Sequence, residues 1–230
     1  MKRYVLCLKH GNKYDHRYVN NLYSMVSRHL TVDHEFVCLT EDSTGLNKNI
    51  RVIPLDTKGD ISGWWYKPTI FNPSLGLEGT ILFLDLDVII FNNIDMLFSY
   101  EPDKFCIIDD FYAKRKKTHG MNSSCFRFIG GSNSNVYYEF VKNSQDIMRT
   151  MHGDQDWMQK VITENYSYWP HSWIKSYKWE MHKEADITKR GNRYIVNGEP
   201  IFDKDSSIAV FHGNPKPDQI DHKWCIENWR

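Results

Sequence analysis

The feature that most constrains the fold is a run of four apolar residues, 81–84, that leads directly into Asp85 and Asp87. The run does not alternate with polar residues, which is typical of a central parallel strand buried on both faces. In open α/β sheets, side chains at the carboxyl ends of such strands face the crevice where ligands bind. The segment therefore predicts a parallel α/β sheet with a carboxylate pair at its ligand-binding edge.

Other segments support this architecture. Four more short apolar runs are typical of strands: residues 4–8, 35–40, 50–55 and 105–108. Apolar residues at helical spacing predict helices within 19–30 and 136–148. We therefore predict a mixed, mostly parallel sheet flanked by helices. Residues 113–117 are interpreted as a solvated basic turn, with a contact to phosphate or acceptor as the alternative. The part from Tyr166 onward is interpreted as loops and short elements over a binding site.

Charge and cysteine content exclude several classes of protein. The 29 basic and 29 acidic residues cancel, so no charge excess indicates a nucleic acid partner. The five cysteines are odd in number and show no CxxC spacing, which favours a reducing compartment over a disulfide framework. No apolar run reaches the length of about 18 residues that a transmembrane helix needs. We expect a soluble cytoplasmic protein.

The pair Asp85 and Asp87 offers two hard oxygen ligands one residue apart. Such ligands suit Mg²⁺ or Mn²⁺ and not a thiol-preferring metal. A divalent cation held there would bridge the protein to a bound diphosphate. The alternative interpretation is a pair of surface or helix-capping acids at a strand end.

Several short motifs stand around this pair. They are Gly-Trp-Trp-Tyr-Lys-Pro at 63–68, Asn-Asn-Ile-Asp-Met-Leu-Phe at 92–98, Met-Asn-Ser-Ser at 121–124, Gly-Asp-Gln-Asp-Trp-Met at 153–158 and Val-Phe-His-Gly-Asn-Pro-Lys-Pro at 210–217. Their order and separations resemble the family that includes glycogenin and the bacterial lipopolysaccharide galactosyltransferases. These are retaining enzymes of GT-A fold that use nucleotide sugars, so the resemblance implies this fold and activity.

The resemblance also implies a metal site. By this resemblance, Asp85 and Asp87 bind the cation, Mn²⁺ or Mg²⁺, and a C-terminal histidine is the third ligand. In this chain Val210 occupies the family's histidine position, and His212 stands directly before Gly213. His212 therefore serves as the third ligand only if the loop is altered.

Contacts to the donor follow from the same resemblance. It implies that Lys67, Asn122, Gly213 and Lys216 bind the nucleotide sugar. It also implies that residues 121–124 form a turn before a strand, although Ser124 stands where the family usually has glycine. Ammonium groups stabilise the negative charge of a leaving diphosphate, and a glycine lets backbone approach a phosphate closely. The alternative for residues 212–216 is an ordinary polar turn.

Residues 154–156, Asp-Gln-Asp, are expected near the reacting sugar. By resemblance, Asp154 and Gln155 lie near the anomeric carbon and are the candidate catalytic residues, and Asp156 is a candidate for binding the acceptor. The alternative is that these acids simply favour a helix N-terminus after Gly153. For Trp64 and Trp65, core packing is favoured over stacking on a sugar.

These inferences describe a single glycosyltransferase domain over 1–230, with a nucleotide-sugar-binding half (1–110) and an acceptor and site-closing half (111–230). The expected reaction moves a hexose from a nucleoside diphosphate sugar, UDP-linked by resemblance, to a hydroxyl of a saccharide or glycolipid acceptor. The nucleotide is expected against residues 8–14 and 40–42.

Two alternatives from other classes remain at this point. A haloacid-dehalogenase-like phosphatase also begins with an apolar strand that runs into Asp-x-Asp, with the first Asp as phosphoryl acceptor. Here, however, Val88 follows the pair, and the motif lies well inside the chain. A sugar-nucleotide-binding module without catalytic activity is the second alternative, and the departures at Ser124 and Val210 motivate it.

Overall fold

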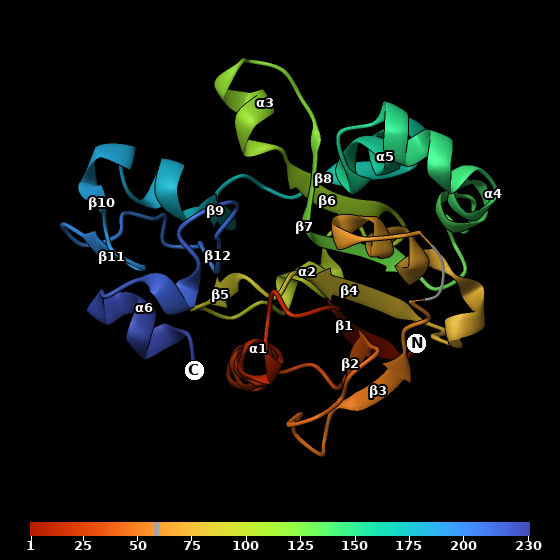
Figure 1. Ribbon diagram of the computed structural model, residues 1–230, viewed down its shortest axis with the longest axis horizontal. Coiled ribbons are helices and arrows are strands. Elements are labelled where there is room, and N and C mark those ends of the chain that lie inside the picture. The colour runs from red at the N-terminus through yellow and green to blue at the C-terminus, as the bar shows by residue number, and fades with distance from the viewer. Residues whose placement is uncertain (58–59) are drawn as a thin grey trace.

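A seven-stranded mixed sheet forms the centre of the protein, with the order β3-β2-β1-β4-β7-β6-β8 (Figure 1). The structure, a computed structural model, describes residues 1–57 and 60–230. The strands of this sheet are β1 (Arg3–Lys9), β2 (Glu35–Thr40), β3 (Arg51–Pro54), β4 (Thr80–Leu84), β6 (Phe105–Asp109), β7 (Met121–Ile129) and β8 (Tyr166–Tyr168). Only β7 runs antiparallel to its neighbours in this sheet, β4 and β6. The predicted mixed, mostly parallel sheet is confirmed.

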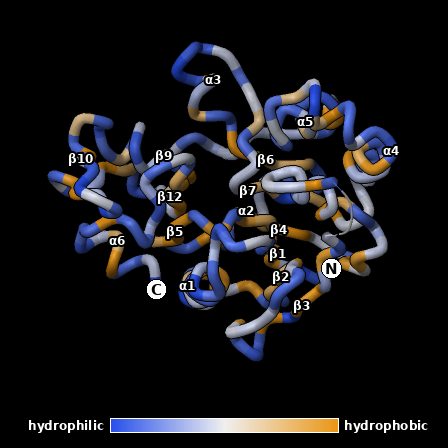
Figure 2. The backbone as a smooth tube through the Cα atoms, viewed as in Figure 1, coloured by the Kyte–Doolittle hydropathy of each residue, from blue (hydrophilic) through white to orange (hydrophobic). Residues whose placement is uncertain are grey.

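Helices cover both faces of this sheet (Figure 1). Helix α1 (His16–His29) belongs to one core cluster, whereas α4 (Asn135–Thr150), α5 (Asp154–Val161) and the 3₁₀ helix η1 (Gly63–Phe71) belong to the other. Along β4, Leu82 and Leu84 join the α1 cluster, and Ile81 and Phe83 join the opposite cluster. Successive side chains of a strand point to opposite faces, so burial on both faces requires the continuous apolar run. Figure 2 shows this apolar interior beneath hydrophilic outer loops.

A second, three-stranded sheet was not foreseen from the sequence. Its order is β5-β12-β9, from β5 (Val88–Ile90), β12 (Ile208–Val210) and β9 (Ile174–Ser176). Strand β5 follows β4 after a short link, residues 85–87, which connects the two sheets. The backbone of this link is held on both sides. Asp85 N donates to Ser124 O at 2.9 Å, and Phe211 N donates to Asp87 O at 3.1 Å.

The remaining elements are short. They are η2 (Pro73–Leu75), α2 (Met96–Ser99), α3 (Phe111–Arg115), the π-helix η3 (Tyr177–Met181), η4 (Glu184–Asp186), the hairpin of β10 (Ile187–Arg190) and β11 (Arg193–Val196), η5 (Pro217–Gln219) and α6 (Lys223–Asn228). The part after Tyr166 thus consists of short elements, as predicted. In the described part of the chain, none of the helices combines the length and apolar character needed to cross a membrane.

Two local predictions were wrong. The basic residues from 113 onward do not form only a turn, because helix α3 includes the first three residues of that segment. Its N-cap is Asp110, whose carboxylate accepts bonds from Tyr112 N and Ala113 N. Residues 121–124 are not a turn before a strand, because they already belong to β7. The register between β6 and β7 shifts between Ile107 and Ile108, which leaves residues 123–125 as a bulge.

Candidate active site

The candidate site lies where the order of strands reverses direction. From β1 the chain adds β2 and β3 on one side, and β4 then pairs on the other side of β1. At such a switch point the carboxyl ends of two strands diverge and leave a crevice for a ligand. Two adjoining cavities of about 600 and 260 Å³ occupy this position and share Lys13, Trp64, Lys67, Asp85 and Asp87. We call them together the central cleft.

Lys67 connects the acidic side chains in the floor of the cleft. Helix η1 holds its side chain, which is only 9% exposed, with Nζ 2.9 Å from Asp85 Oδ1 and 3.5 Å from Asp154 Oδ2. Nζ also donates to Ser123 Oγ at 2.9 Å. Ser123 Oγ in turn donates to Asp154 Oδ2 at 2.6 Å. One ammonium group and one hydroxyl therefore fix two carboxylates.

Electrostatics in this cluster follow from burial and from the neighbouring charges. Burial by itself would lower the pKa of Lys67, but the carboxylates of Asp154 and Asp85 raise this pKa above its ordinary value. The pKa of Asp85 is also raised, because burial and the nearby Asp87 and Asp154 charges outweigh the attraction of Lys67. Lys67 is thus firmly cationic at neutral pH.

Asp87 is held by two different partners. Tyr14, in the loop after β1, donates its hydroxyl to Asp87 Oδ2 at 2.9 Å, and Lys216 Nζ forms an ion pair with the same oxygen. Lys216 Nζ also donates to Phe211 O at 3.0 Å. Gly213, at φ +67°, begins the turn that carries Lys216 back toward the cleft. A left-handed backbone is most easily adopted by glycine.

The three residues 154–156 begin α5 and line the cleft. Asp154 is buried, and its carboxylate forms an ion pair with Lys67 and accepts a hydrogen bond from Ser123. Gly153 occupies the N-cap position. Asp156 and Gln155 are half-buried along the same wall. The predicted catalytic residues therefore share one cavity with the predicted donor residues.

Asn122 also lies in the cleft, at the start of the β7 bulge. Its Nδ2 donates to Asp110 Oδ1 at 3.3 Å, and its Oδ1 accepts from Ser124 N at 3.1 Å. The amide thus stabilises the bulge and fixes the position of Asp110.

Three cleft residues were not recognised as site residues from the sequence. Ser123 and Tyr14 give no motif signal, although Tyr14 falls within the segment 8–14 predicted to contact the nucleotide. Trp64 was expected in the core, but it is 57% exposed and lines both cavities. Only Trp65 is in the core, stacked on Phe140. Adjacent aromatics at the start of η1 point to opposite sides, which sequence periodicity alone does not reveal.

His212 lies in the wall of the cleft, but it is engaged elsewhere. Its Nε2 hydrogen bonds with Ser176 Oγ at 2.6 Å, and its ring contacts Phe111 and Trp179 with centroid distances of 5.6 and 4.2 Å. Burial, together with the charges of Lys178 and Lys216, lowers the pKa of His212 to about 4. A neutral imidazole is the form that binds metals.

The carboxylate pair fits a hard divalent cation. Asp85 and Asp87 present oxygen ligands in a cleft of suitable size, and Mg²⁺ commonly uses one or two carboxylates together with substrate phosphates and water. Within residues 1–57 and 60–230, no three His, Cys, Asp or Glu side chains are grouped closely enough to hold a metal by themselves. With His212 bonded to Ser176, a cation on Asp85 and Asp87 would take its remaining ligands from the bound diphosphate and water.

Comparison with known proteins gives a match over most of the chain. The model of a family described as nucleotide-diphospho-sugar transferase matches residues 56–209. A search of curated proteins gives no significant match.

Several solved structures share the fold. LgtC, a galactosyltransferase crystallised with donor and acceptor sugar analogues, has 12% identity and a TM-score of 0.63, over 97% of this chain and 91% of LgtC. The glycosyltransferase GlyE of Streptococcus pneumoniae TIGR4 has 15% identity and a TM-score of 0.57, over 75% of this chain and only 47% of GlyE. Mouse xyloside xylosyltransferase 1 has 16% identity and a TM-score of 0.53, over 93% of this chain and 98% of that protein.

Proposed function

Because the chain belongs to the nucleotide-diphospho-sugar transferase family and is a glycosyltransferase of GT-A fold, we propose that it transfers a hexose from a UDP-linked donor. The acceptor in this proposal is a hydroxyl of a saccharide or of a lipid-linked saccharide, and the reaction depends on Mn²⁺ or Mg²⁺. Family membership removes the phosphatase interpretation. The five cysteines are free and buried, which supports the proposed location in a reducing cytoplasm.

The observation that carries this proposal is the pairing of two lysines with the acidic pair in one cleft. Lys67 contacts Asp85, and Lys216 contacts Asp87. Cleavage of a nucleotide sugar places new negative charge on the leaving diphosphate, and fixed cationic groups stabilise that charge. When the donor binds, the two ammonium groups are positioned to exchange carboxylate oxygens for phosphate oxygens.

Asp85 and Asp87 would hold the divalent cation in this proposal. When bound, the cation supplies Lewis-acid stabilisation of the diphosphate. Tyr14 keeps its hydroxyl on Asp87 and so limits the orientations of that carboxylate. His212 is proposed as an additional ligand, which requires the imidazole to leave Ser176.

The transfer itself breaks the bond between the anomeric carbon and the diphosphate oxygen, whose electron pair leaves with UDP. A new bond forms between the anomeric carbon and the acceptor oxygen, and the proton of the acceptor hydroxyl passes to a phosphate oxygen of the leaving UDP. We assign Gln155 and Asp154 to the stabilisation of the positive charge that develops on the sugar. Asp154 is fixed by Lys67 and Ser123, so its charge is preorganised. Asp156 is assigned to the acceptor, and retention at the anomeric carbon is inferred by family analogy.

UDP release from a panel of UDP-hexoses, in Mn²⁺ and after chelation, tests this function. We expect slow hydrolysis of at least one donor, faster release when a saccharide acceptor is added, and loss of both on chelation. Asp87→Asn serves as the inactive control because it keeps the size of the side chain. Unchanged rates after chelation, or in Asp87→Asn, would remove the assigned metal role. Intact UDP-hexoses with every acceptor would contradict the assigned donor.

A further inference from the structure

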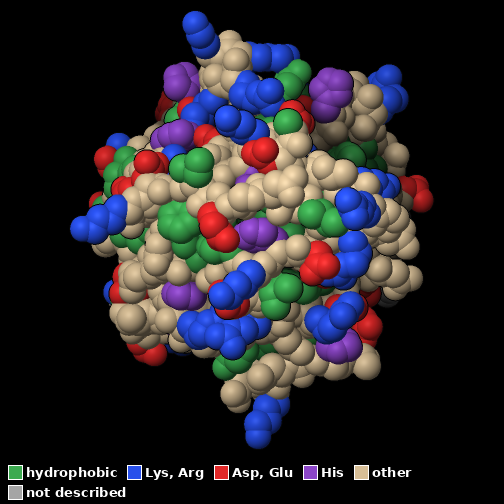
Figure 3. Space-filling model, turned by 90° about the vertical axis from the view of Figure 1, so that its left-hand side faces the viewer, with side chains coloured by type: hydrophobic (Ala, Val, Ile, Leu, Met, Phe, Trp, Pro, Cys, Tyr) green, Lys and Arg blue, Asp and Glu red, His purple; other side chains and the backbone are tan. Residues whose placement is uncertain are grey.

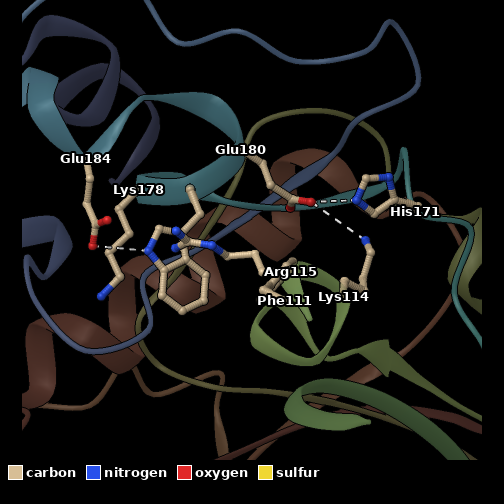
Figure 4. Close-up of a pocket in the computed structure, with 8 residues that line it drawn as sticks. Phe111, Lys114, Arg115, His171, Lys178, Glu180 and Glu184 are labelled. Carbon is tan, nitrogen blue, oxygen red and sulfur yellow. Dashed lines mark hydrogen bonds and ion pairs between the residues drawn. The ribbon is translucent and has the colours of Figure 1, made fainter. Parts of the chain in front are cut away.

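A second pocket, of about 470 Å³, lies between α3 and η3, on the far side of His212 from the central cleft. Its volume falls in the range of about 300 to 1,000 Å³ that is typical of small-molecule sites. The pocket is shown in Figure 4 and is lined by Phe111, Lys114, Arg115, His171, Lys178, Trp179, Glu180 and Glu184. We call it the α3–η3 pocket.

The α3–η3 pocket adjoins the central cleft through a thin wall. His212 lines the cleft, and its ring stacks on Phe111 and lies tilted against Trp179. Both of these side chains line the pocket. Lys178 Nζ, from the pocket side, donates to Asn214 O at 3.4 Å in the loop that carries Gly213. A molecule in this pocket would thus lie next to the proposed donor site, which is where an acceptor must be held.

The two acidic side chains of the pocket are already occupied. Figure 4 shows the carboxylate of Glu180 joined to both His171 and Lys114. Its Oε1 accepts from His171 Nε2 and lies 3.7 Å from Lys114 Nζ, and its Oε2 accepts from Ser176 N at 2.8 Å. Glu184 Oε1 accepts from Trp179 Nε1 at 3.3 Å.

By contrast, Arg115 and Lys178 have no carboxylate partner in an ion pair among the residues that the structure describes. Both cations lie against Trp179, with Arg115 Cζ 4.8 Å and Lys178 Nζ 5.3 Å from its ring centroid. Burial lowers the pKa of Lys178, and the charge of Lys216 adds to this effect while Glu184 opposes it. The pocket is therefore short of negative charge.

The stacked Arg115 is suited to binding an anion. Arginine on an aromatic face keeps its planar donor fork oriented, and this fork matches the oxygens of phosphate groups. The pocket lies below a wider basic surface, since Lys and Arg side chains gather over α3 at the top of the face shown in Figure 3. A phosphate monoester carries about two negative charges at neutral pH. Three cationic side chains of the pocket exceed its two carboxylates, so a phosphate would meet a net positive lining and two charge-assisted donors, Arg115 and Lys178.

We propose that the α3–η3 pocket binds a phosphate group on the acceptor, through Arg115 and Lys178, so that the substrate of this enzyme is a phosphorylated saccharide. The proposal rests on the proposed function, because it places an acceptor beside the donor in the central cleft. The phosphate could belong to a soluble sugar phosphate or could link the sugar to a lipid. Both sources present phosphate oxygens to Arg115 and Lys178, with about two negative charges on a sugar phosphate monoester and about one on a phosphodiester that links the sugar to a lipid.

The test compares a hexose 6-phosphate with the unmodified hexose by saturation-transfer NMR and calorimetry, with the central cleft saturated by UDP and Mn²⁺. We expect the phosphorylated sugar to bind at least about tenfold more tightly, as charge-assisted hydrogen bonds allow. Arg115→Gln should remove most of this preference, and Arg115→Lys should restore part of it. A polyprenyl-phosphate-linked hexose in detergent micelles forms a parallel arm, and tighter binding there would identify the lipid-linked source.

Lys116→Gln is the matched control. Lys116 directly follows Arg115, but its ammonium lies over Tyr112 and does not line the pocket. An equal loss in both variants, no preference for the phosphate, or displacement of the sugar phosphate by UDP would overturn the proposal. UDP affinity is measured in the same samples. If the wild type binds no UDP, the proposed function fails and the acceptor role of the pocket fails with it. Normal UDP binding without a phosphate preference refutes only the pocket assignment.

Discussion

At the scale of single residues, the candidate site depends on how a few charges are shared. Lys67 forms ion pairs with Asp85 and Asp154 and donates to Ser123, and Lys216 forms an ion pair with Asp87. The sequence indicated both lysines, both members of the acidic pair and Asp154 through their motifs. Ser123 and Tyr14 were missed because a hydroxyl that orients a charged group leaves no periodicity or spacing to recognise.

Lys67→Met should destabilise the fold. It leaves the buried carboxylate of Asp154 and the neighbouring Asp85 without their cation, and breaking such a pair typically costs about 3 kcal/mol. Urea unfolding at neutral pH measures this free energy. Ser123→Ala, which keeps the ion pairs, should cost only about 1 kcal/mol. Equal stabilities of Lys67→Met and the wild type would show that the cluster contributes nothing to folding.

Lys216→Ala should weaken binding of UDP much more than binding of uridine. Its ammonium is assigned to the diphosphate, and a charge-assisted hydrogen bond of this kind accounts for about a tenfold change in affinity. Calorimetric titrations of UDP and uridine into both proteins give the comparison. A similar loss for the two ligands would make Lys216 a structural residue of the closing loop.

At the scale of elements, the predicted strands and long helices are present because each carries a strong local signal. Strand β2 has the predicted bounds, and α1 and α4 lie where the helical spacing placed them. The three-stranded sheet was not predictable in the same way. Its strands are three residues each and come from distant parts of the chain, so their pairing is decided by tertiary contacts. The β7 bulge is likewise set by its pairing with β6.

The end of β7 offers a sharp test of close backbone packing. A Cβ at Gly130 would lie 1.8 Å from Leu77 O, whereas at Gly131 it would meet nothing within 4 Å. Gly130→Ala should therefore destabilise the protein by about 3 kcal/mol or more, since backbone must move. Gly131→Ala, at a position with φ +85°, should lower the free energy of unfolding by only about 1 kcal/mol. Urea unfolding of the two variants measures both free energies. A larger loss of stability in Gly131→Ala than in Gly130→Ala would contradict the close packing of Gly130 against Leu77.

At the scale of the whole molecule, the central cleft is assembled from parts that are far apart in sequence. Tyr14 follows β1, Lys67 lies in η1, Asp154 begins α5, and Lys216 comes after β12. Motifs identified most of these residues but not their neighbours, because the contacts between them exist only after folding. The orientation of His212 toward Ser176 is a property of this kind.

Stability should fall as the solution is acidified from pH 7 to 5. Burial, with a further contribution from His222, lowers the pKa of His182 to about 4, and burial similarly lowers that of His212. The unfolded histidines therefore bind protons at a higher pH than the folded ones, so stability is full above about pH 6.5 and is lost below it. His182 Nε2 has no hydrogen-bond partner in the described structure, so His182→Phe should be tolerated. Between pH 7 and pH 5, the free energy of unfolding measured in urea should fall by roughly 1 kcal/mol less in this variant than in the wild type. An identical pH dependence of the two proteins would exclude His182 as a cause of the acid destabilisation.

Metal-dependent donor binding at Asp87 is tested by calorimetric titration of UDP into the wild type and Asp87→Ala, with Mn²⁺ present and after chelation. We predict binding to the wild type that is lost on chelation and lost in Asp87→Ala, while circular dichroism shows that the variant remains folded. Binding of UDP with the same affinity in all four samples, or no binding of UDP to the wild type with Mn²⁺, would refute the assignment of the central cleft as a metal-dependent nucleotide-sugar site.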